Sequence, residues 1–384
     1  MNKKNQGMII ILGLMIAAVL IISGCSQASE SQTGNVVKQK AAEPIKIGFL
    51  ESLTGDVAAI GQNNKAAVEM AIEEVNAEGG INGRPLQLIY EDGKCNAKDA
   101  ATAAQKLVNI DQVSAIIGGL CSSETLAAAP IAEGKAVMIS PGSSSPAITN
   151  AGDYIFRDYP SDVFQGVYAA RFAYDKLGAR KVAVLYCLTD FAVGLQARFD
   201  DEFKRLGGTI VSEQSFEQSS RDLRSQLSKI KESNPDAVFF LGYTEAIISG
   251  LIQAEELGIN AQIIGSDAWG DPTIPQKAGS AADGAIYFEV KTPVSGELKT
   301  KMKAHTGSDE MTIATPQAYD ALKILAQVMR EIGTNPSDIK DALYKINYTG
   351  YSGNIVFDEN GDMLSADYIV KTYMDGKLAD YQGD

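Results

Sequence analysis

Short apolar runs alternate with segments in which apolar residues recur at helical spacing, and this pattern continues along most of the chain. Such runs are typical of buried strands, and the recurring positions are typical of helices with one apolar face. In the first part we expect strands at 45–50, 86–90, 115–119 and 136–139, and helices at 61–77, 97–110 and 124–133. Further on we expect helices at 164–177, 194–206, 222–232, 245–257, 297–303 and 316–332, and strands at 181–186, 209–213, 237–241, 262–264 and 285–290. Continuous apolar strands that alternate with helices predict an α/β protein with parallel sheets covered on both faces.

The first 43 residues do not follow this pattern. Lys3 and Lys4 precede an apolar run at 8–22, and the small residues Ser23 and Gly24 stand directly before Cys25. This order is typical of a lipoprotein signal peptide at 1–24 that is cleaved to leave Cys25 as a lipid-bearing N-terminus. An uncleaved anchor helix is the alternative. Residues 25–43 are rich in Ser, Gln, Ala and Lys, which predicts a flexible tether. Both alternatives place the globular part outside the cytoplasm.

Length and charge narrow the class of protein. Roughly 340 residues follow the tether, which is more than one core usually organises, so we expect two lobes of about 100 to 200 residues. The net charge is −14, and cleavage before Cys25 would leave 32 basic against 48 acidic residues, a net charge of −16. An acidic chain is a poor partner for nucleic acid. No later segment is long and apolar enough to span a bilayer, so we expect membrane contact through the N-terminal lipid only, and a monomer.

Two polar turns follow strand-like runs and are candidates for binding a small carboxylate. The segments 121–125 and 140–146 gather serine hydroxyls and free backbone amides at strand ends. In parallel sheets ligands commonly bind there, and the first amides of a helix have no partner within the helix. We expect Ser122 or Ser123 to cap the helix at 124–133. Ordinary capping without a ligand is the alternative.

Little in the sequence supports catalysis. His305 is the only histidine and lies in a polar stretch, where a surface position is expected. The chain has no Gly-x-Ser-x-Gly motif and no Walker phosphate loop. Its cysteines lack the close pairing of metal sites. We therefore expect neither an enzyme nor a bound cofactor or metal.

Several motifs, taken in order, resemble one known family. They are Ile47-Gly48, Leu53-Thr54-Gly55, 78–83 (Glu-Gly-Gly-Ile-Asn-Gly), 118–123 (Gly-Gly-Leu-Cys-Ser-Ser) and 138–142 (Met-Ile-Ser-Pro-Gly). Their order and spacing resemble the leucine/isoleucine/valine-binding proteins of ABC transporters, which are type I periplasmic solute receptors. The resemblance covers nearly everything after residue 44. It implies two doubly wound parallel-sheet lobes joined by a hinge of three chain segments.

The resemblance also implies where the chain divides and which cysteines pair. We expect crossings near Asp162, Glu289 and Ser365, so that 44–162 with 290–365 forms lobe 1 and 163–289 with 366–384 forms lobe 2. The placement of Cys95 and Cys121 matches the disulfide of the family, with two free thiols as the alternative. Cys187 follows a buried-strand pattern and is expected to be an unpaired core residue.

The family's ligand contacts can be transferred one by one. Ser122 stands where the family's serine receives the ligand α-carboxylate, beside Ser123 of the same turn. Ser144 replaces a threonine that contacts carboxylate and ammonium, and a carbonyl of Gly142 or Ser143 would accept from the ammonium.

Other matched positions would complete the site from both lobes. Asp267 replaces a glutamate that pairs with the ammonium, although a capping or solvated aspartate is the alternative. Tyr243 and Phe191 match aromatic positions near the ligand and could equally belong to the core. Trp269 would join them on lobe closure, and Ile60 replaces a bulky aromatic residue of some relatives.

The resemblance implies a receptor that captures an amino acid by lobe closure and delivers it to the permease subunits of an ABC importer. We expect the ligand to be aliphatic, branched-chain or otherwise apolar. The alternative is a sensor of the same fold that passes an amino acid, amide or small carboxylate signal to a signalling partner.

Overall fold

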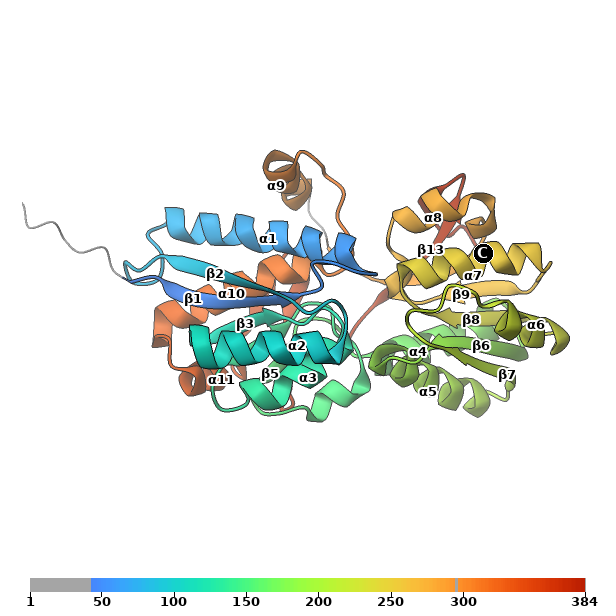
Figure 1. Cartoon of the computed structure of the whole chain (residues 1–384), viewed down its shortest axis with the longest axis horizontal. Coiled ribbons are helices and arrows are strands. Elements are labelled where there is room, and N and C mark those ends of the chain that lie inside the picture. Colours follow the sequence, from blue (N-terminus) through green and yellow to red (C-terminus); the bar gives the residue numbers. More distant parts are fainter. Residues whose placement is uncertain (1–42, 294–295, 384) are drawn as a thin grey trace, which may run out of the picture. The chain divides into compact units, whose positions relative to one another are not determined.

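The computed structural model describes residues 43–293 and 296–383, and the predicted signal peptide, Cys25 and most of the tether lie outside these residues. Two parallel sheets, each covered by helices on both faces, organise the described chain (Figure 1). We call the sheet β2-β1-β3-β4-β5 with its helices the first lobe, and the sheet β14-β13-β10-β9-β8-β6-β7 with its helices the second lobe.

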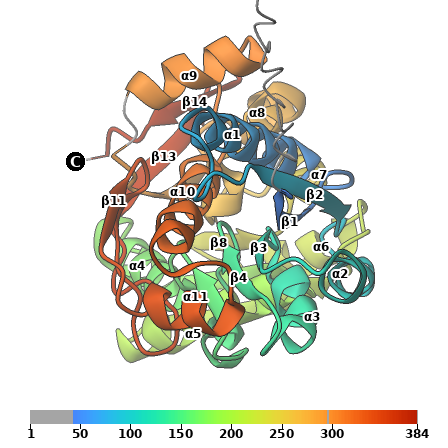
Figure 2. The same ribbon diagram turned by 90° about the vertical axis from the view of Figure 1, so that its left-hand side faces the viewer.

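The first lobe is built from parallel strands that are almost fully buried. The strands are β1 (Ile45–Glu51), β2 (Leu86–Asp92), β3 (Ala115–Gly118), β4 (Val137–Ser140) and β5 (Ile155–Arg157). The helices are α1 (Ala58–Ala77), α2 (Ala97–Gln105), α3 (Ser122–Ala132), α9 (Gly296–Thr306), α10 (Thr315–Ile332) and α11 (Pro336–Leu343). Figure 2 shows α1, α10 and α11 on one face of the sheet and α2 and α3 on the other. All strand ends that carry the polar turns therefore meet at one edge.

The second lobe repeats this arrangement and adds two antiparallel strands at one edge. The strands are β6 (Lys181–Cys187), β7 (Thr209–Phe216), β8 (Ala237–Leu241), β9 (Gln262–Gly265), β10 (Ile286–Val290), β13 (Tyr368–Met374) and β14 (Lys377–Asp380). The helices are α4 (Asp162–Arg171), α5 (Asp190–Arg205), α6 (Arg224–Glu232), α7 (Thr244–Glu256) and α8 (Thr273–Ala278). Strands β11 (Tyr348–Gly350) and β12 (Gly353–Ile355) form a separate hairpin.

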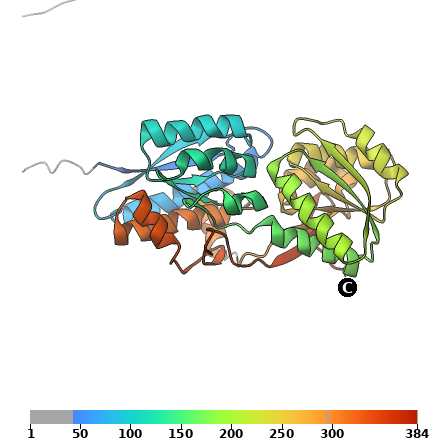
Figure 3. The same ribbon diagram turned by 90° about the horizontal axis from the view of Figure 1, so that it is seen from below.

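The chain passes between the lobes at three places. It leaves the first sheet after β5 and enters α4, it leaves the second sheet after β10 and enters α9, and it returns to the second sheet at β13. In Figure 3 the green segment that follows β5 and the brown-red segment that precedes β13 can be followed from one sheet to the other. Arg157 braces the first of these segments, because its fully buried guanidinium donates to both Asp362 carboxylate oxygens at 2.6 and 2.7 Å.

Most predicted strands and helices are present, with bounds that differ by a few residues. The helix expected at 97–110 changes to a π-helical turn at Lys106–Asp111. The predicted helix cap was wrong: α3 begins at Ser122 and its N-cap is Cys121. The physical reason is that Glu124 accepts a hydrogen bond from the Cys121 amide at 2.9 Å, while the Ser122 hydroxyl accepts from the Ser145 amide. The sequence pattern did not predict α8, α11, β5 or the four strands β11 to β14.

Candidate functional site

A cavity of about 40 Å³ lies between the strand ends of the two lobes. Its walls combine apolar side chains with two serines and an aspartate. The lining residues are Val57, Ile60, Leu120, Cys121, Ser122, Gly142, Ser144, Phe191, Tyr243, Asp267, Ala268 and Ile313. Seven of the ten predicted ligand residues are among them, which are Ile60, Ser122, Gly142, Ser144, Phe191, Tyr243 and Asp267. We call this space the inner cavity.

The first lobe contributes hydroxyl groups whose hydrogen bonds leave capacity for a ligand. The Ser122 hydroxyl is 1% exposed and accepts from the Ser145 amide at 3.1 Å, so its own proton remains available. The Ser144 hydroxyl donates to Asp162 Oδ2 at 3.0 Å, so its lone pairs remain available. Gly142 allows the turn to pass close to Leu120, since a Cβ there would meet a Leu120 methyl at 2.7 Å. The wall can thus donate to an anion and accept from a cation at neighbouring points.

The second lobe contributes Asp267, which is held by three hydrogen bonds. Its Oδ2 accepts from the Tyr159 hydroxyl at 2.7 Å, its Oδ1 accepts from the Ala268 amide at 2.9 Å, and its own amide donates to Gln165 Oε1 at 3.2 Å. Burial raises the pKa of Asp267, although the hydrogen bond from Tyr159 opposes this shift. The carboxylate is oriented before any ligand arrives, which reduces the cost of binding a cation.

Asp162 does not line the inner cavity, but it contacts Ser144, which does, and the sequence reasoning did not select it. It is fully buried at the start of α4, one oxygen accepts from Ser144, and Oδ1 has no partner among the described residues. Burial raises the pKa of Asp162 well above its ordinary range, and the charge of Asp267 raises it further. Two buried carboxylates that repel each other are stabilised by a shared cation. No motif marked Asp162, because its role depends on a contact with Ser144 across the fold.

The remaining wall of the inner cavity is apolar. The rings of Phe191 and Tyr243 stack with centroids 5.7 Å apart, and both are buried. Val57 and Ile60 come from the start of α1, and Ile313 comes from the segment before α10. This wall suits an aliphatic or otherwise apolar group.

Three predicted ligand residues do not line the inner cavity. Trp269 is fully buried, donates from Nε1 to the Phe240 carbonyl at 3.1 Å, and stacks on Tyr373. The Ser143 hydroxyl lies 2.8 Å from the Thr125 hydroxyl, inside the first lobe. Ser123 lines a separate surface cavity between α3 and α5. These three side chains support the site from behind or beside it.

A disulfide and a buried glutamate support the Ser122 turn. The predicted bond between Cys95 and Cys121 is present, and Cys187 is a free, buried cysteine as expected. Glu124 is fully buried and accepts from the amides of Cys95 and Cys121, each at 2.9 Å. Burial raises the pKa of Glu124 to about 7, although these hydrogen bonds oppose the shift.

Two direct contacts join the lobes beside the inner cavity. Arg221 Nη2 of the second lobe lies 2.5 Å from Asp56 Oδ1 of the first lobe, just before α1. Gln218 Nε2, from the same loop as Arg221, donates to the Cys95 carbonyl at 3.3 Å. Both contacts would be lost if the lobes separated. Within residues 43–293 and 296–383, no cluster of metal-binding side chains occurs and no helix meets the length and hydropathy of a membrane span.

Comparisons with known proteins agree with this architecture. Residues 44–377 match the family model described as periplasmic binding protein. A leucine-, isoleucine-, valine-, threonine- and alanine-binding protein of Pseudomonas aeruginosa is 31% identical over 338 residues, covering 86% of this chain and 90% of the relative.

Two solved structures are similar as well. A leucine binding protein from Thermotoga maritima has a TM-score of 0.81 and 29% identity, covering 88% of this chain and 97% of that one. A branched-chain amino acid transporter substrate binding protein from Streptococcus pneumoniae, in complex with isoleucine, has a TM-score of 0.79 and 29% identity, covering 87% of this chain and 97% of that one. The chain therefore belongs to the periplasmic binding protein family.

Proposed function

We propose that this protein is the extracytoplasmic receptor of an ABC importer and captures an apolar amino acid, of the aliphatic or branched-chain class, in the inner cavity. The observation that carries the proposal is the pair of buried carboxylates Asp162 and Asp267, one of which has an oxygen without a partner in the described chain. Burying two interacting carboxylates is costly, and a ligand ammonium would offset that cost. The Pseudomonas aeruginosa leucine-, isoleucine-, valine-, threonine- and alanine-binding protein and the Streptococcus pneumoniae branched-chain amino acid transporter substrate binding protein support the same ligand class.

Each part of an amino acid has a counterpart in the walls. The α-carboxylate would accept from the Ser122 hydroxyl and from free amides at the start of α3. The ammonium would lie between Asp267, Asp162 and the Ser144 oxygen. The side chain would contact the apolar wall that includes Ile60 and the stacked rings of Phe191 and Tyr243.

Capture would proceed by closure of the lobes about the three connecting segments. The first lobe supplies the hydroxyls, and the second supplies Asp267 and the aromatic rings, so the full set of contacts forms only when the lobes meet. Closure also excludes water, which strengthens the charge contacts. The closed form would be the state that a permease binds. Lipid attachment through Cys25 would keep the receptor, as a monomer, beside that permease.

Calorimetry tests the proposal directly. The purified protein is titrated with the standard amino acids and with matched carboxylates that lack the amino group, such as 4-methylpentanoate for leucine. Apolar amino acids should bind, and at a free concentration of 100 times Kd they should stabilise the fold by about 2.7 kcal/mol. The carboxylates without an amino group should bind far more weakly. Binding of such carboxylates alone, with no effect of Asp267→Asn, would overturn the amino acid assignment.

A further inference from the structure

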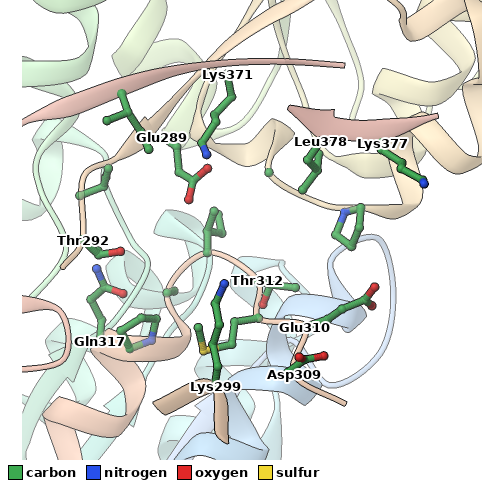
Figure 4. A pocket seen from close by; sticks show the side chains of 18 of the residues that line it. Glu289, Thr292, Lys299, Asp309, Glu310, Thr312, Gln317, Lys371, Lys377 and Leu378 are labelled. Atoms are coloured by element: carbon green, nitrogen blue, oxygen red, sulfur yellow. The ribbon is translucent and has the colours of Figure 1, made fainter. Parts of the chain in front are cut away.

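A second, much larger cavity of about 730 Å³ lies beside the segments that connect the lobes (Figure 4). We call it the outer cavity. Its lining comes from both lobes, including the segment 309–317 before and within α10, the end of β10, and the β13–β14 hairpin. A volume of this size lies within the usual range of about 300 to 1,000 Å³ for small-molecule sites. Ile313 lines both cavities, and Tyr159, which lines the outer one, donates to Asp267 of the inner one.

Charged side chains enter the outer cavity without pairing with one another. Among the described residues, the carboxylate of Glu289 has no hydrogen bond and no ion pair, and the same holds for the ammonium group of Lys299. Figure 4 shows Lys371 and Glu289 projecting into the cavity from one side and Lys299 from the opposite side. Lys371 pairs with Asp380 at 2.7 Å and is also the strongest cationic influence on Glu289. Burial raises the pKa of Glu289, and Lys371 and Lys299 oppose that shift.

A buried amide adds an independent sign that something polar belongs here. Gln317 lines the outer cavity from the first turn of α10 and is only 2% exposed. Its Oε1 has no hydrogen-bond partner among the described residues. A buried amide oxygen without a donor lowers stability, so such groups are normally satisfied by protein, water or ligand.

The mixture of charges indicates the chemistry of the occupant. A ligand with only negative charge would meet the carboxylates of Glu289, Asp309 and Glu310, and one with only positive charge would meet the lysines. A ligand that carries both an ammonium and a carboxylate group can pair with Glu289 and with Lys299 together. The same ligand can donate to Gln317 Oε1.

We propose that the outer cavity is a second binding site, for a small zwitterion such as a free amino acid. Its ammonium would contact Glu289 and Gln317 Oε1, and its carboxylate would contact Lys299 and Lys371. Because Lys299 and Gln317 belong to the first lobe and Lys371 and Glu289 to the second, an occupant bridges the lobes and favours their closed arrangement. This last coupling rests on the proposed function of the inner cavity, whereas the existence of the second site does not.

The test is a calorimetric titration of the standard amino acids into wild-type protein and into two kinds of variant. Asp267→Asn disables the inner cavity, and Lys299→Gln or Glu289→Gln disables the outer one. Lys299 is an exposed residue of α9, so its substitution should not disturb folding. Lys98→Gln, on the exposed side of α2 and outside both cavities, is the matched control.

We expect two binding events in the wild type. The weaker event falls at least tenfold in Lys299→Gln and Glu289→Gln, is unchanged in Lys98→Gln, and persists in Asp267→Asn. A single event that Asp267→Asn removes would overturn the second site and leave the proposed function intact. A single event that Lys299→Gln removes and Asp267→Asn spares would overturn the proposed function and leave the second site intact. The absence of any event, or a second event that none of the outer-cavity variants weakens, would also overturn the second site.

Discussion

The inner and outer cavities share Ile313 as a lining residue, and Tyr159 of the outer cavity donates to Asp267 of the inner one, yet the two are built in different ways. In the inner cavity, Asp267 is fixed by hydrogen bonds before a ligand arrives, and its walls are almost fully buried. In the outer cavity, Glu289 and Lys299 have no partner among the described residues, whereas Lys371 pairs with Asp380 and Asp309 pairs with Lys303. A fixed group loses little freedom on binding, whereas ordering a lysine costs roughly 1 kcal/mol or more. We therefore expect tight, selective binding in the inner cavity and weaker, more tolerant binding in the outer one.

The largest expected effect comes from removing charge in the inner cavity. Asp267→Asn should weaken amino acid binding by about 30- to 4,000-fold, because loss of one partner of a buried charge pair costs about 2 to 5 kcal/mol. Asp162→Asn should weaken it in the same direction. Calorimetric Kd values measure both effects.

Asp222→Asn is the control for these two variants, because in the described part of the chain Asp222 pairs only with Arg224, on the surface of the second lobe. It should leave Kd unchanged. Equal binding by wild type and both inner-cavity variants would show that the buried pair does not hold the ammonium, and the contrast between the two cavities would disappear.

The next effect concerns Glu124, the buried carboxyl group that supports the turn at Ser122, and the pH dependence of the free energy of unfolding. Since the pKa of buried Glu124 is raised to about 7 from 4.5, the folded state holds this proton more tightly than the unfolded chain does. Its contribution to stability is fully present below pH 4.5 and is lost as pH rises through 7, a loss of about 3 kcal/mol. Glu51, whose pKa is also raised by burial and by the charge of Glu124, acts with the same sign.

Urea unfolding of the ligand-free protein at pH 5, 6.5 and 8 measures this slope. The unfolding free energy of the wild type should fall as pH rises, and Glu124→Gln should flatten the fall even if it lowers stability at every pH. Glu217→Gln is a suitable control, because Glu217 is an exposed carboxylate whose substitution should leave the slope as it is. Parallel slopes for wild type and Glu124→Gln would contradict the raised pKa of Glu124 as the cause of the pH dependence.

The sequence predicted some features of the fold and of the site, and it could not predict others. Strand β8 was predicted at its observed bounds, because a five-residue apolar run with Val and two Phe, between Pro235 and Gly242, is typical of a buried strand. The seven predicted residues of the inner cavity follow strand ends or helix starts, which a linear motif can mark. Asp162 and Tyr159 could not be found in this way, since their roles depend on contacts with Ser144, 18 residues from Asp162, and with Asp267, 108 residues from Tyr159.

The positions of Trp269 and of the helix cap differ from the sequence predictions, and both differences have local reasons. Trp269 lies two residues beyond Asp267, and the short helical turn between them directs its ring into the core instead of the cavity. The N-cap is Cys121 because its amide donates to the Glu124 carboxylate. The sequence favoured Ser122 or Ser123 instead, because serine is a common N-cap residue. Sequence patterns thus locate the segments of a site better than the direction of each side chain.

A smaller effect should appear in ligand selectivity. Ile60 is 3% exposed and lines the apolar wall, so Ile60→Ala would enlarge the inner cavity. The ratio of Kd for phenylalanine to Kd for valine should fall by about tenfold, since differences of a few methyl groups in such a wall are worth about 1 to 3 kcal/mol. Ile72→Ala, on the same helix and away from the cavity, should lower stability and keep the ratio. An unchanged ratio in Ile60→Ala would place the ligand side chain elsewhere, for example toward the outer cavity.

The smallest effect separates closure from direct ligand contact. Arg221 and Asp56 pair across the lobes without lining either cavity, and both side chains are partly exposed. Such a pair contributes about 0.2 to 1 kcal/mol, so Arg221→Gln should weaken ligand binding by about 1.5- to 5-fold, mainly through faster dissociation as measured by stopped flow. Arg224→Gln is the matched control, because Arg224 pairs with Glu256 within the second lobe at 2.7 Å. An equal change of the dissociation rate in both variants would show that the effect comes from the altered net charge of the protein. An effect confined to Arg221→Gln would mean that contacts between the lobes, outside the inner cavity, set part of the affinity of that cavity.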